Sequence, residues 1–210
     1  MSTRRRRMPP AIGGTLLALA VSAAAGALTP LGQQYLPEPL APLANSSGSW
    51  TLIAFGAVYL SRARPVPAAV LGAACFILMN ELYAVVSTLR GNPYSAGLLD
   101  FWTVVAVVVG PVVGLSASWL KGDRPHLLVP AVAAPSAVLI GEGVYYLTVL
   151  PEFTTYGILE VAAGALLLLA LVARRVRTVQ HGVAAAALAV VGAAAFVTAY
   201  TAAPAVLGAL

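Results

Sequence analysis

Residues 127–150 read LLVPAVAAPSAVLIGEGVYYLTVL, an apolar run that contains a single carboxylate, Glu142. A helix needs about 20 apolar residues to cross a hydrocarbon core of roughly 30 Å, so this run predicts a membrane-spanning helix. Similar runs recur along all 210 residues, which are 60% apolar and only 9% charged. Soluble domains carry about 25% charged residues. The composition therefore excludes a water-soluble globule and predicts an all-α, polytopic transmembrane helix bundle.

Breaks at proline, glycine and charged residues divide the chain into about seven candidate spans. The spans are Ala11–Pro30, Ser49–Ser61, Val66–Leu89, Leu98–Leu120, Leu127–Leu150, Tyr156–Ala173 and Val183–Pro204. The second is the shortest, so the sequence leaves open whether it crosses fully. We expect residues 1–10 to form a basic cytoplasmic tail and residues 11–210 to form a single transmembrane helical domain.

The basic residues predict the orientation of the chain. With a cytoplasmic N-terminus, seven spans bring every basic residue except Arg90 to the inner side, namely Arg4, Arg5, Arg6, Arg7, Arg62, Arg64, Lys121, Arg124, Arg174, Arg175 and Arg177. The positive-inside rule favours this arrangement, which puts the C-terminus outside. We therefore expect these residues to contact the lipid bilayer rather than nucleic acid.

The first apolar run has a second interpretation. The basic residues Arg4–Arg7 before an apolar stretch also resemble a signal peptide, with Ala23–Ala25 as a small-residue cleavage pattern. The run continues to Leu28 without a polar cleavage region, which favours a retained helix. Small residues at close-packing spacing would suit a partner membrane protein on this helix: Ala20 with Ala24, and Ser22 with Gly26.

Four carboxylates fall inside the apolar spans, all in the predicted outer half: Glu81, Asp100, Glu142 and Glu160. Each costs about 2.5–3.5 kcal/mol on insertion scales, so we expect the side chains to face the bundle interior. Polar and aromatic residues accompany them at helical spacing. The candidate ligand-binding residues are Glu81, Glu142, Glu160, Asn80, Tyr145, Tyr146, Asp100 and Trp102.

Two interpretations of the carboxylates stay open. Arg90 is expected to pair with Asp100 at the outer ends of two neighbouring spans. Glu81, Glu142 and Glu160 have no basic partner at their depth. They are either protonated structural residues that hydrogen-bond to Asn or Tyr, or the lining of a functional cavity.

Missing residue types exclude several chemistries. The only lysine, Lys121, lies in an inner loop, so no retinal Schiff base can form. The only histidines, His126 and His181, lie at inner ends, which excludes a histidine metal site or a Ser-His hydrolase on the acidic side. No glycine-rich phosphate loop with a lysine occurs. We expect no cofactor and no metal.

Three functions compete on this sequence. An outward-facing acidic and aromatic cavity suits a cation, so the first is a component that binds or transports a small solute, cationic or proton-coupled. The second is a membrane-embedded enzyme acting on a lipid or isoprenoid, in which a protonated glutamate serves as general acid, as in terpene cyclases. The third is a structural membrane protein.

Three short motifs carry a resemblance to a known family. They are Leu43-Ala44-Asn45-Ser46-Ser47-Gly48-Ser49-Trp50, Gly110-Pro111-Val112-Val113-Gly114 and Gly141-Glu142-Gly143-Val144-Tyr145-Tyr146. The chain resembles a family of small actinobacterial multi-pass proteins known as a domain of unknown function. The resemblance implies a bacterial plasma membrane and supplies no activity and no catalytic residue.

Overall fold

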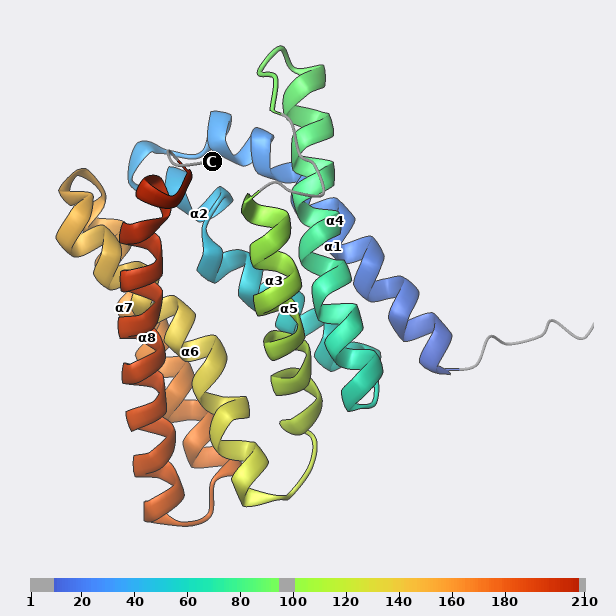
Figure 1. Ribbon diagram of the computed structural model, residues 1–210, viewed down its shortest axis with the longest axis vertical. Coiled ribbons are helices and arrows are strands. Elements are labelled where there is room, and N and C mark those ends of the chain that lie inside the picture. The colour runs from blue at the N-terminus through green and yellow to red at the C-terminus, as the bar shows by residue number, and fades with distance from the viewer. Residues whose placement is uncertain (1–9, 95–100, 208–210) are drawn as a thin grey trace, which may run out of the picture.

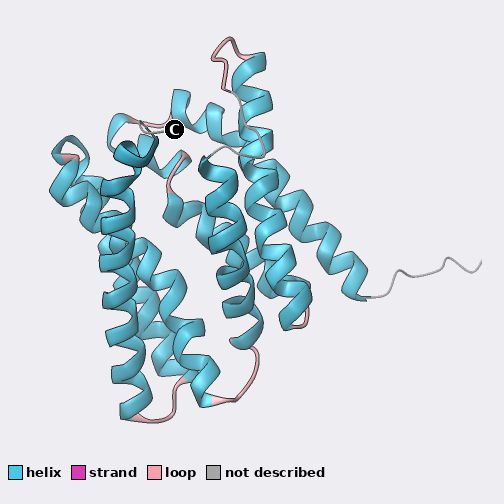
Figure 2. Cartoon of the chain, viewed as in Figure 1, coloured by secondary structure: helices cyan, strands magenta, loops and turns pink. Residues whose placement is uncertain are grey.

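The computed structural model describes residues 10–94 and 101–207, and these residues form helices and connecting loops without a strand (Figures 1 and 2). In chain order the elements are α1 (Pro10–Tyr35), the 3-10 turn η1 (Glu38–Leu40), α2 (Ala41–Ala44), α3 (Ser47–Ser61), α4 (Pro65–Leu89), α5 (Phe101–Trp119), α6 (Pro125–Val149), the 3-10 turn η2 (Pro151–Phe153), α7 (Thr154–Arg175) and α8 (Val179–Leu207).

Six helices among the described residues, α1 and α4 to α8, are long and apolar enough to cross a membrane. The protein is therefore a membrane-spanning helical bundle, as the composition predicted. The seventh expected span, Ser49–Ser61, corresponds to α3, which has 15 residues. At 1.5 Å per residue α3 is about 23 Å long, so it is too short to cross a hydrocarbon core alone.

The first helix runs further than predicted. Pro30 was expected to end the span, but it lies inside α1, which continues to Tyr35. Membrane-spanning helices tolerate an internal proline when neighbouring groups satisfy the freed backbone. The helix ends where Leu36 precedes Pro37, because a residue before proline disfavours the helical conformation.

A proline-rich connection returns the chain into the bundle. Pro37, Pro39 and Pro42 limit this segment to the short elements η1 and α2. The next helix, α3, then starts among buried residues, and Ser46 before it is only 1% exposed. Its start faces Glu142, which lies seven residues, or about 10 Å, before the end of α6. Thus α3 is a half-length helix that begins inside the bundle.

The half-length α3 lies between two groups of long helices. In one group α4 packs against both α1 and α5, and in the other α6 packs against both α7 and α8. Figure 1 shows α1, α4 and α5 on one side of α3, and α6, α7 and α8 on the other. The core beside α3 contains Val58, Cys75 and Met79. One face of α3 packs into this core, whereas Leu52 and Leu60 on its other side are exposed.

Small residues allow α4 and α5 to approach closely. A Cβ atom on Gly110 would lie 2.5 Å from the Cα atom of Ala73, and one on Gly114 would collide with the backbone of Ala68. Two glycines one turn apart are a frequent means of close helix packing in membranes. This contact holds together two walls of the cavity described below.

The small residues of α1 divide between two faces. Ser22 and Gly26 are buried, and Gly26 packs against the backbone of Met79 in α4. Ala20 and Ala24 are exposed. Half of the predicted pattern therefore serves packing within the chain, and only the Ala20–Ala24 face stays a prediction for a partner protein.

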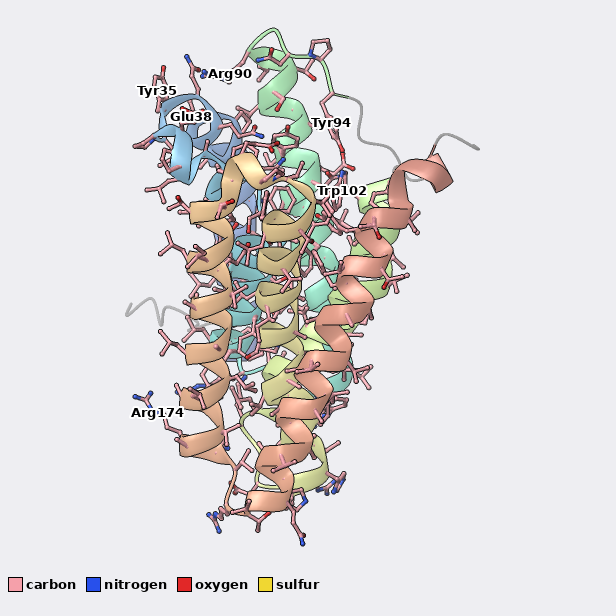
Figure 3. All side chains as sticks on the ribbon, turned by 90° about the vertical axis from the view of Figure 1, so that its left-hand side faces the viewer. Tyr35, Glu38, Arg90, Tyr94, Trp102 and Arg174 are labelled. Carbon is pink, nitrogen blue, oxygen red and sulfur yellow. The ribbon has the colours of Figure 1, made fainter. Side chains whose placement is uncertain are left out.

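Charge is segregated between the two ends of the bundle. Figure 3 shows Arg90, Tyr35 and Glu38 at one end and Arg174 at the other. The last turn of α7 and the connections α3–α4, α5–α6 and α7–α8 carry the described basic residues other than Arg90: Arg62, Arg64, Lys121, Arg124, Arg174, Arg175 and Arg177. The basic end is the one that the positive-inside rule assigns to the cytoplasm, and this orientation stays a prediction.

Candidate functional site: a buried helix start between two cavities

The start of α3 is defined by Ser46. The side chain of Ser46 accepts a hydrogen bond from the backbone N–H of Ser49 at 3.0 Å, which is the usual role of a serine N-cap. The first N–H groups of any helix have no partner within the helix, and they carry its positive dipole end. Inside a membrane protein these groups need an acceptor from elsewhere in the fold.

Glu142 of α6 supplies that acceptor. Its Oε1 accepts the N–H of Ser47 at 2.8 Å, and its Oε2 accepts the N–H of Gly48 at 2.5 Å. The hydroxyl of Ser46 lies 2.9 Å from Oε2. Glu142 is only 2% exposed. The carboxylate in the middle of α6 therefore caps α3, as an anion stabilises a helix start.

Glu160 of α7 reaches the same point. Its Oε1 lies 3.1 Å from Ser46 Oγ, and it accepts a hydrogen bond from the hydroxyl of Tyr156 at 3.3 Å. Glu160 is 4% exposed, and its carboxyl group is within hydrogen-bonding reach of that of Glu142. We refer to Glu142 and Glu160 below as the acid pair.

Counting hydrogens assigns one proton to the acid pair. Two backbone N–H groups donate to Glu142, which favours its ionised, acceptor-only form. The single hydroxyl hydrogen of Ser46 can serve only one of the two carboxyl groups. Two adjacent buried carboxylates also repel each other strongly. The contacts are satisfied when Glu142 is ionised and Glu160 is protonated.

Gly48 is required by the close approach of these groups. A Cβ atom at this position would lie 2.7 Å from Leu139 Cδ2 and 3.1 Å from Glu142 Oε2, and it would collide with Glu160 Oε1. A side chain here would displace Glu160 and Leu139 and so disturb the contact between α3 and the acid pair. The glycine thus permits a contact that no other residue type would allow without rearrangement.

A cavity of about 400 Å³ lies on one side of the α3 start. We call it the aromatic cavity. Its ring-bearing walls are Trp50, Phe76, Tyr83, Tyr94, Phe101, Trp102, Phe196 and Tyr200. Its uncharged polar lining is Asn45, Ser46, Ser47, Thr51 and Asn80. The rings contact one another edge to face, as Trp50 does with Tyr83, or stacked, as Phe196 does with Tyr200 at 4.5 Å.

The aromatic cavity is linked to the acid pair through α3. The hydroxyl groups of Ser47 and Tyr200 form a short hydrogen bond at the cavity wall. The N–H of the same Ser47 donates to Glu142. Figure 3 shows Trp102 and Tyr94, two residues of the lining, toward the Arg90 end of the bundle.

A second cavity of about 690 Å³ also borders the first turn of α3 and lies between α1 and α7. We call it the α1–α7 groove. Apolar side chains of α1, α2, α3 and α7 form most of its lining, including Leu28, Leu43, Leu52 and Leu159. Glu160 and Tyr156 also line it. Ser46 and Ser47 thus line the aromatic cavity, and Glu160 lines the α1–α7 groove.

Comparison with known proteins identifies the family and no activity. A family model described as a family of unknown function matches residues 5–205. The chain belongs to the family DUF6518. This agrees with the resemblance found in the sequence. No curated protein and no solved structure matches the chain. The function of this DUF6518 member has to be argued from its own geometry.

In this DUF6518 protein the predicted ligand-binding residues occupy different places. Asn80 and Trp102 line the aromatic cavity, and Glu160 lines the α1–α7 groove. Glu142 lines neither cavity and caps α3 instead. Glu81 is half-buried and lines neither cavity. Asp100 lies outside the described residues, and so does its expected pairing with Arg90.

The two predicted tyrosines pack around the site without lining it. Tyr145 contacts the ring of Tyr200 at 5.3 Å between centroids. Tyr146 contacts the ring of Tyr156 at 5.2 Å. Tyr145 therefore packs against Tyr200, which lines the aromatic cavity. Tyr146 packs against Tyr156, which hydrogen-bonds to Glu160.

Sequence reasoning missed Ser46 and Ser47, which connect the acid pair with the aromatic cavity. A signal was present, because a serine before an apolar run is typical of a helix N-cap. The motif around Ser46 was noticed only for the resemblance it carries. Without the fold, nothing indicated that the partner of this helix start was a glutamate 96 residues later.

Proposed function

We propose that this protein binds a small, weakly hydrated organic cation in the aromatic cavity, as the binding component of a transport system in the bacterial plasma membrane. The observation that carries the proposal is the composition of the cavity wall, in which eight aromatic residues surround about 400 Å³. Aromatic faces attract cations, and a desolvated contact is worth about 2 kcal/mol.

The lining argues for this class of ligand over other charged solutes. Among the residues that the structure describes, no lysine, arginine or histidine lines the aromatic cavity, so an anion would find no counter-charge from them. A metal ion would need several oxygen ligands including carboxylates, and the carboxylate of Glu142 is taken up by α3. An alkylammonium ion needs only ring faces and a few uncharged oxygens, such as those of Asn45 and Ser47.

The discontinuity at α3 supports a role in transport. Helices interrupted inside the membrane are typical of substrate sites in secondary transporters. Here Ser47 contacts both Glu142 and Tyr200, so a change of protonation at the acid pair would reach the cavity wall through one residue. This is a physical route for proton-coupled binding. A partner membrane protein would then complete the transport path.

Acid catalysis on an isoprenoid receives less support. A cyclase of this kind needs a proton donor in the cavity that holds the substrate. No aspartate, glutamate or histidine lines the aromatic cavity among the residues described. The protonated member of the acid pair, Glu160, lines the other cavity. The aromatic walls therefore fit cation binding better than catalysis.

Tryptophan fluorescence of the detergent-purified protein tests the proposal. Two of the three tryptophans, Trp50 and Trp102, line the cavity, so Trp119→Phe leaves only reporters at the site. We expect a trimethylalkylammonium ion to shift this emission at concentrations about 30-fold lower than its neutral tert-butyl isostere. Equal affinity for the two probes, or no response to either, would contradict a cation site.

A pair of ring variants locates the binding. Tyr200→Leu removes a cavity ring, whereas Tyr59→Leu removes a ring near the basic end that contacts Lys121. Only Tyr200→Leu should weaken the binding of the trimethylalkylammonium ion. A similar loss in both variants would mean that the probe binds elsewhere or that both proteins are misfolded, which circular dichroism distinguishes.

A further inference from the structure

The α1–α7 groove is lined by Glu160, and one oxygen of this carboxyl group has no hydrogen-bond partner among the described residues. Glu160 Oε2 is buried, and no hydrogen bond to it is found among the described residues. The other oxygen, Oε1, is already engaged by Ser46 and Tyr156. An unpaired carboxyl oxygen in an apolar setting is costly, so the position favours a ligand that can supply a hydrogen bond.

The walls of the groove determine what kind of ligand can reach that atom. Leu28 of α1 and Leu159 of α7 line the groove and are more than half exposed on the membrane-spanning surface. An apolar chain can therefore enter from the bilayer between these two helices. The volume of about 690 Å³ is within the range of ligand pockets.

We propose that the α1–α7 groove binds a single-chain membrane amphiphile with an uncharged hydroxyl headgroup, whose O–H donates to Glu160 Oε2. The chain lies along the leucines of α1 and α7. The inference does not rest on the aromatic cavity, because Trp50 is the one described residue that lines both spaces.

The charges around the groove select a neutral headgroup. No lysine or arginine of the described ranges lines the groove, so a phosphate or carboxylate headgroup would meet a carboxyl group without a counter-charge from them. The negative charge of the acid pair is compensated by the N–H groups of Ser47 and Gly48, which leaves little attraction for an ammonium headgroup. A hydroxyl satisfies Oε2 without moving a charge out of water.

Quenching of Trp50 tests the proposal on the full chain in lipid nanodiscs. In a Trp102→Phe, Trp119→Phe background Trp50 is the sole tryptophan. The probes are three brominated alkyl chains of equal length that end in a hydroxyl, a carboxylate or an ammonium group. Because Trp50 also lines the aromatic cavity, the readout is the part of the saturable quenching that filling the groove removes. We expect this part to need about tenfold lower concentrations of the alcohol than of the other two probes, as one hydrogen bond predicts.

Two variants of α7 provide the control for location. Ala163 lines the groove one turn from Glu160, whereas its neighbour Ala162 is exposed and does not line it. Ala163→Phe should fill the groove and abolish this part of the saturable quenching, and Ala162→Phe should leave it unchanged. Both alanines are exposed, so neither substitution disturbs the core. Equal quenching in the two variants would overturn the site.

Two variants of Glu160 test the headgroup contact. In the protonated Glu160 the hydrogen lies on Oε1, toward Ser46, so in Glu160→Gln the amide nitrogen takes that place and the amide oxygen keeps an acceptor at the position of Oε2. The preference for the alcohol should therefore persist in Glu160→Gln and shrink about tenfold in Glu160→Met, which has no acceptor oxygen. If the preference is the same in Glu160→Met and in the parent, the contact with Oε2 is wrong. If all three probes quench equally in the parent, the groove binds alkyl chains without selectivity for the headgroup, and the proposal fails.

Discussion

Glu142 Oε2 accepts the N–H of Gly48 at 2.5 Å, so a carboxylate from the middle of one membrane-spanning helix closes the start of another. The contact explains why the protein tolerates a carboxylate so far from the end of a membrane-spanning helix. An isolated carboxylate would be expensive, but here the dipole and the free N–H groups of α3 stabilise it. The same bond relieves the cost of beginning a helix inside the bundle.

Glu142→Gln should destabilise the protein strongly. The amide has one acceptor oxygen where the carboxylate has two, so one N–H of α3 would face an NH₂ group. We expect a loss of about 2–3 kcal/mol in the free energy of unfolding, as for a buried hydrogen bond to a charged group. Thermal unfolding in detergent measures it. Glu81→Gln is the control, because Glu81 is only half-buried, and equal melting temperatures for the two variants would show that Glu142 does not anchor α3.

Gly48→Ala should separate α3 from the acid pair. Its Cβ would lie 2.7 Å from Leu139 Cδ2 and would collide with Glu160 Oε1. Gly56 belongs to the same helix, and a Cβ there would meet no atom within 4 Å. We expect Gly48→Ala to lower the melting temperature and Gly56→Ala to leave it unchanged or raise it, since alanine favours helix. A larger effect at Gly56 would refute this account of the α3 start.

Reporter fusions can test the orientation. If α3 completes a crossing together with the segment before it, fusions after Arg64, Arg124 and Arg177 should all read cytoplasmic, because these residues follow every second helix. A fusion at the C-terminus should then read outside. If α3 does not cross, the fusion after Arg64 will disagree with one placed before α1.

Lys121 gives a prediction for alkaline pH. It lies between α5 and α6, outside the membrane-spanning segments, where burial and the nearby charge of Arg62 lower its pKa from the ordinary 10.5. The folded state thus binds fewer protons at this site than the unfolded chain. The free energy of unfolding should therefore rise with pH toward 10.5 through this group.

The matched variants are Lys121→Met and Arg174→Met. The first should remove part of the rise in stability with pH, whereas the second, at an exposed position of the same end, should not. Unfolding followed at several pH values up to 10.5 measures the difference. A steeper rise in Lys121→Met than in the parent would show that the sign is wrong.

Composition and hydropathy predicted the helical membrane fold well, because each long helix must satisfy its own backbone and bury it in lipid. They predicted the position of α6 to within a few residues. The expected span was Leu127–Leu150, and the helix is Pro125–Val149. They did not show that α3 begins inside the bundle. That depends on where the chain returns after Tyr35, which tertiary packing decides.

The carboxylates were found but not their partners. Sequence periodicity indicates which face of a helix is polar, and it placed Glu142 and Glu160 toward the interior correctly, since both are nearly fully buried. It cannot indicate that both meet Ser46, because that contact joins residues 96 and 114 positions apart. The two cavities could not be predicted from the sequence for the same reason, because residues at the start of α3 line both of them.

The late position of Glu142 in the chain also bears on how the protein is made. When the segment containing α3 leaves the ribosome, its capping carboxylates have not yet been synthesised, and its 15 residues are too few to insert stably by themselves. The start of α3 can be satisfied only after α6 and α7 have entered the bilayer. Membrane insertion of this chain therefore cannot finish in the order of translation, and the final seating of α3 is a step that awaits the second half of the protein.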